Sequence, residues 1–134
     1  MRKRVNGFTM IEIMAVTGII SVLAMLALPG LLRAKVNGNE SFAQATLKTI
    51  SSACESYAGM NFGQYPTAMA DLVTAVPPYL NEDYTVVTLG GYDFACGTLD
   101  ITGYLCTATP AACNQTGTKT FTITTGAVLA SADC

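Results

Sequence analysis

Histidine and tryptophan are absent from this sequence of 134 residues, and charged residues make up only 12% of it. Without histidine, the chain has no Ser-His-Asp or Cys-His arrangement for nucleophilic catalysis. It also contains neither a P-loop nor a G-x-G-x-x-G fingerprint, so no phosphate-binding loop of these types is expected. These absences disfavour an enzyme, and we expect no catalytic residue and no cofactor.

Basic residues are scarce as well, and they are unevenly distributed. From Arg33 to the last residue there are four basic and eight acidic residues, a net charge of −4. A nucleic-acid surface needs clustered lysine and arginine to displace counterions. We therefore expect no direct nucleic-acid site on a single subunit. The alternative is an electropositive patch to which several subunits contribute.

Metal-ligand patterns are missing too. Cysteine occurs five times but never as a C-x-x-C pair, and without histidine this pattern does not fit a zinc site. The acidic residues Asp93, Asp100 and Asp133 are scattered along the chain, so they do not predict a calcium site. We expect no bound metal.

The most prominent feature that is present is an uncharged apolar run over residues 13–32. As a helix it measures about 30 Å, the thickness of the hydrocarbon core of a bilayer. The basic triplet at 2–4 precedes it, as in a secretory signal peptide or in a permanent anchor whose basic end stays in the cytoplasm. Neither interpretation accounts for Gly7, or for the single carboxylate of Glu12 beside the run.

The segment around this carboxylate resembles the prepilin signature of type IV pilins and type II secretion pseudopilins. That signature is a short basic leader ending in glycine, then phenylalanine, then glutamate at the fifth mature position. Here the leader is MRKRVNG, residues 1–7, the first mature residue is Phe8, and Glu12 is the fifth. Pro29 falls where many of these proteins carry a helix-bending proline. The resemblance is strongest over residues 1–33.

The resemblance implies that a prepilin peptidase cleaves after Gly7 and methylates the amine of Phe8, which keeps its positive charge. In a filament the apolar helices then form a dry core, in which an unpaired carboxylate is costly. We expect Glu12 to pair with the charged N-terminus of a neighbouring subunit and so to fix the axial register. The alternative is that Glu12 pairs with its own N-terminus, one helical turn away.

The sequence predicts one long helix over residues 9–58, ending near Gly59. Pro29 and Gly30 predict a kink within it, or a partial unwinding of 21–30 on assembly; a static kink where the chain leaves the bilayer is the alternative. Beyond the apolar run, apolar residues recur at helical spacing and predict a buried stripe. This stripe consists of Ala43, Leu47, Ile50, Cys54 and Tyr57, and Ser51, Ser52, Glu55 and Ser56 lie off it.

After the long helix, we expect a short helix at 68–74 capped by Thr67, and then an antiparallel meander. The expected strands are 84–89, 104–109 and 119–124, followed by AVLA at 127–130. The fold class is therefore α+β: a long N-terminal α-helix packed on a small antiparallel β-sheet, as the resemblance to type IV pilins also implies.

With an N-terminal membrane signal, the cysteines favour disulfide bonds in an oxidising compartment. Several arrangements of two bonds are possible, and each leaves one thiol over. The first expected pair, Cys113 with Cys134, closes a loop of about 21 residues, worth about 3 kcal/mol on the chain-entropy model. Cys96 with Cys106 is a plausible second pair between adjacent strands, which leaves Cys54 as an inert thiol on the buried stripe.

The resemblance implies three segments: a leader at 1–7, a hydrophobic transmembrane and assembly helix at 8–32, and a head domain at 33–134. The expected function is that of a pilus subunit for adhesion, motility or DNA uptake, and the alternative is a pseudopilin of a type II secretion system. A membrane-anchored periplasmic binding domain is an alternative from another class.

The expected partners are further copies in a helical filament, the prepilin peptidase, the membrane, and an assembly platform in the inner membrane. The subunit would be single-pass with a cytoplasmic N-terminus before assembly, and part of an extracellular or periplasmic filament afterwards.

Overall fold

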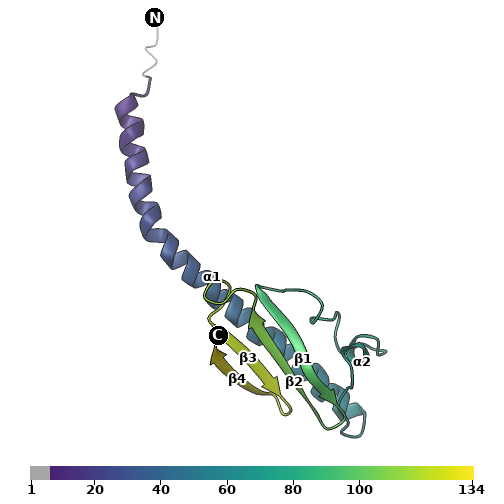
Figure 1. Cartoon of the computed structure of the whole chain (residues 1–134). Helices are drawn as coiled ribbons and strands as arrows, with labels where there is room; N and C mark the ends of the chain where they lie inside the picture. Colours follow the sequence, from purple (N-terminus) through teal and green to yellow (C-terminus); the bar gives the residue numbers. More distant parts are fainter. Residues whose placement is uncertain (1–6) are drawn as a thin grey trace, which may run out of the picture. The chain divides into compact units, whose positions relative to one another are not determined.

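The computed structural model describes residues 7–134, and the expected leader up to residue 6, with its basic triplet, lies outside the described residues. The chain forms two compact units, one ending at Ala34 and one formed by Lys35–Cys134. The described part of the first unit is almost entirely helical, whereas the second holds the rest of this helix, a short helix and a sheet (Figure 1).

The long helix, α1, is Met10–Met60, so the helix predicted at 9–58 is confirmed to within two residues. Pro29 lies inside α1, and the helix continues through it without interruption. Because proline has no N–H to donate, the helix lacks one backbone hydrogen bond there. Unwinding of this region on assembly stays a prediction.

A left-handed turn ends α1. Phe62 has a φ of 55° and Gly63 a φ of 82°, and the N–H of Gly63 donates to the carbonyl oxygen of Ala58 at 2.8 Å. This bond is typical of the Schellman motif, which satisfies carbonyl groups at the end of a helix. It reverses the chain toward Tyr65, whose N–H donates to the carbonyl oxygen of Ile101 at 3.3 Å.

The sheet of the second unit has four strands. They are β1, Tyr92–Asp100; β2, Gly103–Pro110; β3, Lys119–Thr124; and β4, Val128–Asp133. All three pairings are antiparallel, and the strands lie side by side in chain order. The predicted meander and the α+β fold class, an arrangement like that of type IV pilins, are confirmed.

The strand expected at 84–89 is wrong. The backbone N–H and the hydroxyl of Thr85 donate to the carboxylate of Asp83 at 2.8 and 2.6 Å, and these bonds form a turn. Val86 and Val87 are 74% and 58% exposed, so the two central apolar residues of this segment are not buried as they would be in a strand of the core. The first strand is instead β1, whose bounds were not predicted, although the expected bond of Cys96 with Cys106 places Cys96 on a strand.

The short helix expected at 68–74 is α2, Met69–Val73. Its cap differs from the expected one, because the acceptor is the carboxylate of Asp71 in the first turn. The hydroxyl and the N–H of Thr67 donate to this carboxylate, both at 3.1 Å, and the N–H of Ala68 donates to it at 3.0 Å. Thr67 is thus a donor to the helix start and not its cap.

The core of the second unit lies between α1 and one face of the sheet (Figure 1). The predicted stripe is confirmed, since its first four residues are fully buried and Tyr57 packs against them. Ser51, expected off the stripe, is only 1% exposed. The sheet contributes inward-facing residues of three strands: Tyr92, Phe94, Tyr104, Cys106, Ala108, Phe121 and Ile123. From β4, only the half-buried Leu129 packs against this cluster.

Candidate functional site

The first turn of α1 holds the glutamate on which the functional prediction depends. Thr9 lies just before the first helical residue, and its N–H and hydroxyl donate to Oε2 of Glu12 at 2.8 and 2.7 Å. In return, the N–H of Glu12 donates to the hydroxyl oxygen of Thr9 at 3.3 Å. This reciprocal arrangement is a capping box. Its T-x-x-E signal is visible in the sequence, but the sequence analysis missed it.

The alternative in which Glu12 pairs with its own N-terminus stays a prediction, because the amine of Phe8 becomes free only on cleavage after Gly7. In the uncleaved chain, the carboxylate of Glu12 is held within its own first turn by Thr9. Both residues are exposed to solvent. The carboxylate is thus on the surface of the subunit, where a group from another molecule can reach it.

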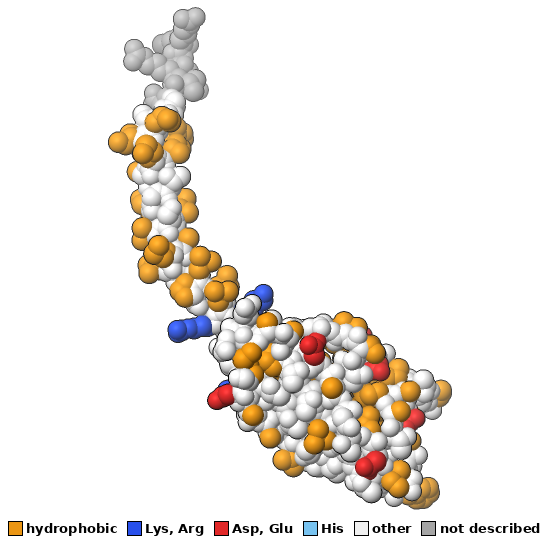
Figure 2. Space-filling view, in the orientation of Figure 1, with side chains coloured by type: hydrophobic (Ala, Val, Ile, Leu, Met, Phe, Trp, Pro, Cys, Tyr) orange, Lys and Arg blue, Asp and Glu red, His pale blue; other side chains and the backbone are white. Residues whose placement is uncertain are grey.

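Apolar side chains cover much of the visible face of the N-terminal part of the helix (Figure 2), and residues 13–32 carry no charge on any face. From residue 8 to 32, every large hydrophobic side chain is between 49% and 85% exposed. A helix that is apolar all round needs burial in a membrane or in a helical assembly. In the described residues, α1 is long and apolar enough to cross a membrane by length and composition.

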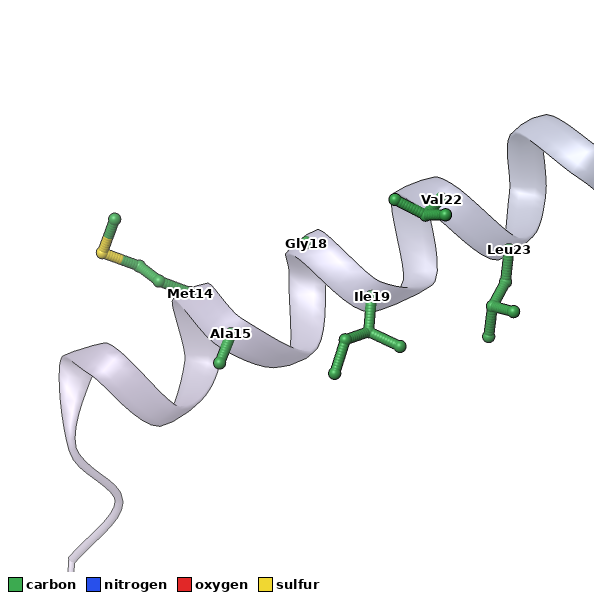
Figure 3. A pocket seen from close by; sticks show the side chains of 6 residues that line it. All are labelled: Met14, Ala15, Gly18, Ile19, Val22 and Leu23. Carbon is green, nitrogen blue, oxygen red and sulfur yellow. The ribbon is translucent and has the colours of Figure 1, made fainter.

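A shallow groove of about 370 Å³ interrupts this apolar surface (Figure 3). It is lined by Met14, Ala15, Gly18, Ile19, Val22 and Leu23. At its centre Gly18 has no side chain, and a Cβ built there would meet nothing within 4 Å. Small residues allow the backbones of two apolar helices to approach closely, so this groove suits contact with another helix.

The expected cleavage site precedes the helix. Gly7 and Phe8 have no regular secondary structure, and the side chain of Phe8 is 83% exposed. Exposed backbone outside a helix is accessible to a peptidase. Cleavage after Gly7 and methylation of Phe8 remain predictions, as do the assembly roles of Glu12, Pro29 and Gly30.

In the second unit, the cysteines form two disulfide bonds. Cys96 is bonded to Cys106 across β1 and β2, with Cα atoms 4.0 Å apart, and Cys113 is bonded to Cys134, with Cα atoms 6.0 Å apart. Cys54 is free and buried. Its burial, helped by the neighbouring charge of Glu55, raises the pKa of the thiol to about 12, so this thiol stays protonated and unreactive near neutral pH.

A polar network that the sequence analysis missed joins α1 to the sheet. The carboxylate of Glu55 accepts hydrogen bonds from the hydroxyls of Tyr65 and Tyr104 at 3.0 and 2.9 Å, and from the N–H of Gly126 at 2.9 Å. Ser51 lies 2.7 Å from the hydroxyl of Tyr104. The donors come from the loop after α1, from β2 and from the turn between β3 and β4, so no local sequence pattern could have revealed them.

We expect Glu55→Gln to destabilise the second unit by about 1–3 kcal/mol at neutral pH, because it weakens three hydrogen bonds to a charged acceptor. Burial by itself raises the pKa of Glu55, but the bonds from Gly126, Tyr104 and Tyr65 together hold it below its ordinary value. The stabilisation is therefore complete above the ordinary glutamate pKa and is lost as the pH falls through the lowered one.

This effect can be measured by thermal unfolding between pH 7 and pH 3. The wild type should lose stability below about pH 4.5, and Glu55→Gln should lose less over the same range. Glu82→Gln, which changes an exposed glutamate in the same way, is the matched control. Equal pH profiles for the wild type and Glu55→Gln would contradict the prediction.

Comparison with known proteins supports the resemblance to pilins and pseudopilins that the sequence predicts. Residues 2–28 match the prokaryotic N-terminal methylation motif. The type II secretion system core protein G of Pseudomonas aeruginosa is 33% identical over 75 residues, which are 56% of this chain and 52% of the relative. The chain thus spans about half the length of this curated relative. The predicted resemblance to pilins and pseudopilins is confirmed, and the motif and the relative support a structural subunit of this kind.

Proposed function

We propose that this chain is a filament subunit that is processed after Gly7, held in the inner membrane by residues 8–32, and polymerised through that helix. In this function the protein is a substrate of the prepilin peptidase and not itself an enzyme. Its head, residues 33–134, lies on the outer side of the inner membrane, and the N-terminus lies in the cytoplasm before assembly.

One observation carries this proposal: a single carboxylate, Glu12, stands at the start of an exposed helix surface that is otherwise uncharged up to Leu32. Neither a signal peptide nor a simple anchor requires this carboxylate, which is energetically costly in lipid. In a filament, cleavage after Gly7 creates an amine on Phe8 that can neutralise Glu12 of the next subunit. The matched methylation motif supports this processing.

Two kinds of filament fit the subunit. A type IV pilus for adhesion, motility or DNA uptake is our first candidate, since the disulfide between Cys113 and Cys134 closes a loop in the head, as in many pilins. A pseudopilus of a type II secretion system is the second candidate. The similarity to the core protein G of such a system favours it.

The test is the intact mass and N-terminal sequence of the chain from its host, recovered separately from sheared surface filaments and from the cell envelope. We expect a chain that begins at N-methylated Phe8. Processed chain in the sheared fraction supports the pilus, and processed chain confined to the envelope supports the pseudopilus. A chain that retains residues 1–7 would overturn the proposal and favour a membrane-anchored binding domain.

A further inference from the structure

We propose that Thr9 is a positioning residue for assembly, which holds the Glu12 carboxylate ready for the amine of the next subunit. This inference rests on the proposed function, in which Glu12 pairs with that amine. Thr9 donates twice to the same carboxylate oxygen, Oε2. Within residues 7–134, no hydrogen bond reaches the other oxygen, Oε1, which leaves it open to an incoming donor.

The benefit of this arrangement comes from the flexibility of glutamate. A free glutamate side chain populates many rotamers, and docking has to select one of them at an entropic cost. The two bonds from Thr9 select the rotamer before the subunits meet. A carboxylate has about four lone-pair sites, so an ammonium group can bind Oε1 while Thr9 still occupies Oε2.

The same contact also orders the backbone that carries the charge. As the residue that caps α1, Thr9 fixes the point at which the helix starts, two residues after Phe8. The carboxylate is thus held beside the end of the chain that becomes charged on cleavage. A neighbouring subunit therefore meets the carboxylate of Glu12 in one fixed position relative to the helix that carries it.

The decisive variants are Thr9→Val, which removes the hydroxyl at nearly constant shape, and Thr9→Ser, which keeps it. The quantity to measure is the share of processed chain that sediments as filament in the host. We expect Thr9→Val to be cleaved after Gly7 and inserted normally, but to assemble up to about tenfold less. The variant keeps only the backbone bond from residue 9 to Glu12, so part of the ordering of the glutamate side chain moves to the docking step. Thr9→Ser should assemble within about twofold of the wild type.

Thr17→Val is the matched control, because it makes the same change in the same apolar helix. The hydroxyl of Thr17 donates only to the helix carbonyl oxygens of Ile13 and Met14, both at 3.0 Å, so this variant should assemble normally. Normal assembly of Thr9→Val, equal failure of Thr9→Ser, or loss of cleavage in Thr9→Val would each overturn the inference. Failure of the proposed function is distinguishable, since it would appear as an unprocessed wild type or as normal assembly of Glu12→Gln.

Discussion

Glu12→Gln and Glu12→Ala chains will be cleaved after Gly7 and inserted into the membrane, but they will form at least about a hundredfold fewer filaments than the wild type. In the dry core of a filament, loss of Glu12 leaves the amine of Phe8 buried without a partner. Removing one member of a buried ion pair costs about 3–5 kcal/mol, which corresponds to a change of two to three orders of magnitude or more at each docking step. The measurement is the share of processed chain that sediments as filament, together with the membrane-bound share.

The two variants separate charge from helix capping. Glutamine can replace glutamate in a capping box, so Glu12→Gln keeps the first turn of α1 and loses only the charge. Alanine loses both. Equal defects in the two variants would assign the effect to the charge, and Glu82→Gln, at an exposed position in the head, should assemble normally. Normal filaments from Glu12→Ala would contradict the role of Glu12 in the filament register.

Repeating patterns allowed most of the fold to be predicted from the sequence. The stripe from Ala43 to Tyr57 has helical spacing, and one face of that helix is buried on the sheet. The segment 119–124 alternates, and its two inward residues, Phe121 and Ile123, are buried in β3. The alternation at 84–89 wrongly predicted a strand, because a strand is stabilised by burial of its side chains and not by β-branched composition alone. There Asp83 instead bonds to Thr85 and starts a turn.

The candidate site was predictable only where its chemistry is contiguous in the chain. Gly7, Phe8 and Glu12 form one short motif, so their proposed roles could be read from the sequence, and the T-x-x-E of the capping box was equally accessible. The partners of Glu55 lie 10 to 71 positions away in the chain. Their convergence depends on the packing of the sheet against α1, which no local pattern specifies.

Removal of the bond between Cys113 and Cys134 will release β4 and destabilise the second unit by about 3 kcal/mol. Among the described strands β4 pairs with β3 alone, and five of its six residues are exposed, so little apolar burial holds it. The loop that carries Cys113 is itself fixed to α1, because Thr118 donates to Glu40 from its N–H and hydroxyl at 2.9 and 2.7 Å. The disulfide therefore ties an edge strand to a loop that is bound to the helix.

The double variant Cys113→Ala/Cys134→Ala tests this prediction through hydrogen exchange and thermal unfolding of the head. We expect the amides of β4 to lose protection and the midpoint to fall by on the order of 10–20 °C. Cys96→Ala/Cys106→Ala is the comparison, because β1 and β2 stay paired by backbone hydrogen bonds on both sides of that bond. It should leave the protection of β4 unchanged. Undisturbed β4 amides in the first variant would mean that backbone pairing with β3 suffices to hold the edge strand.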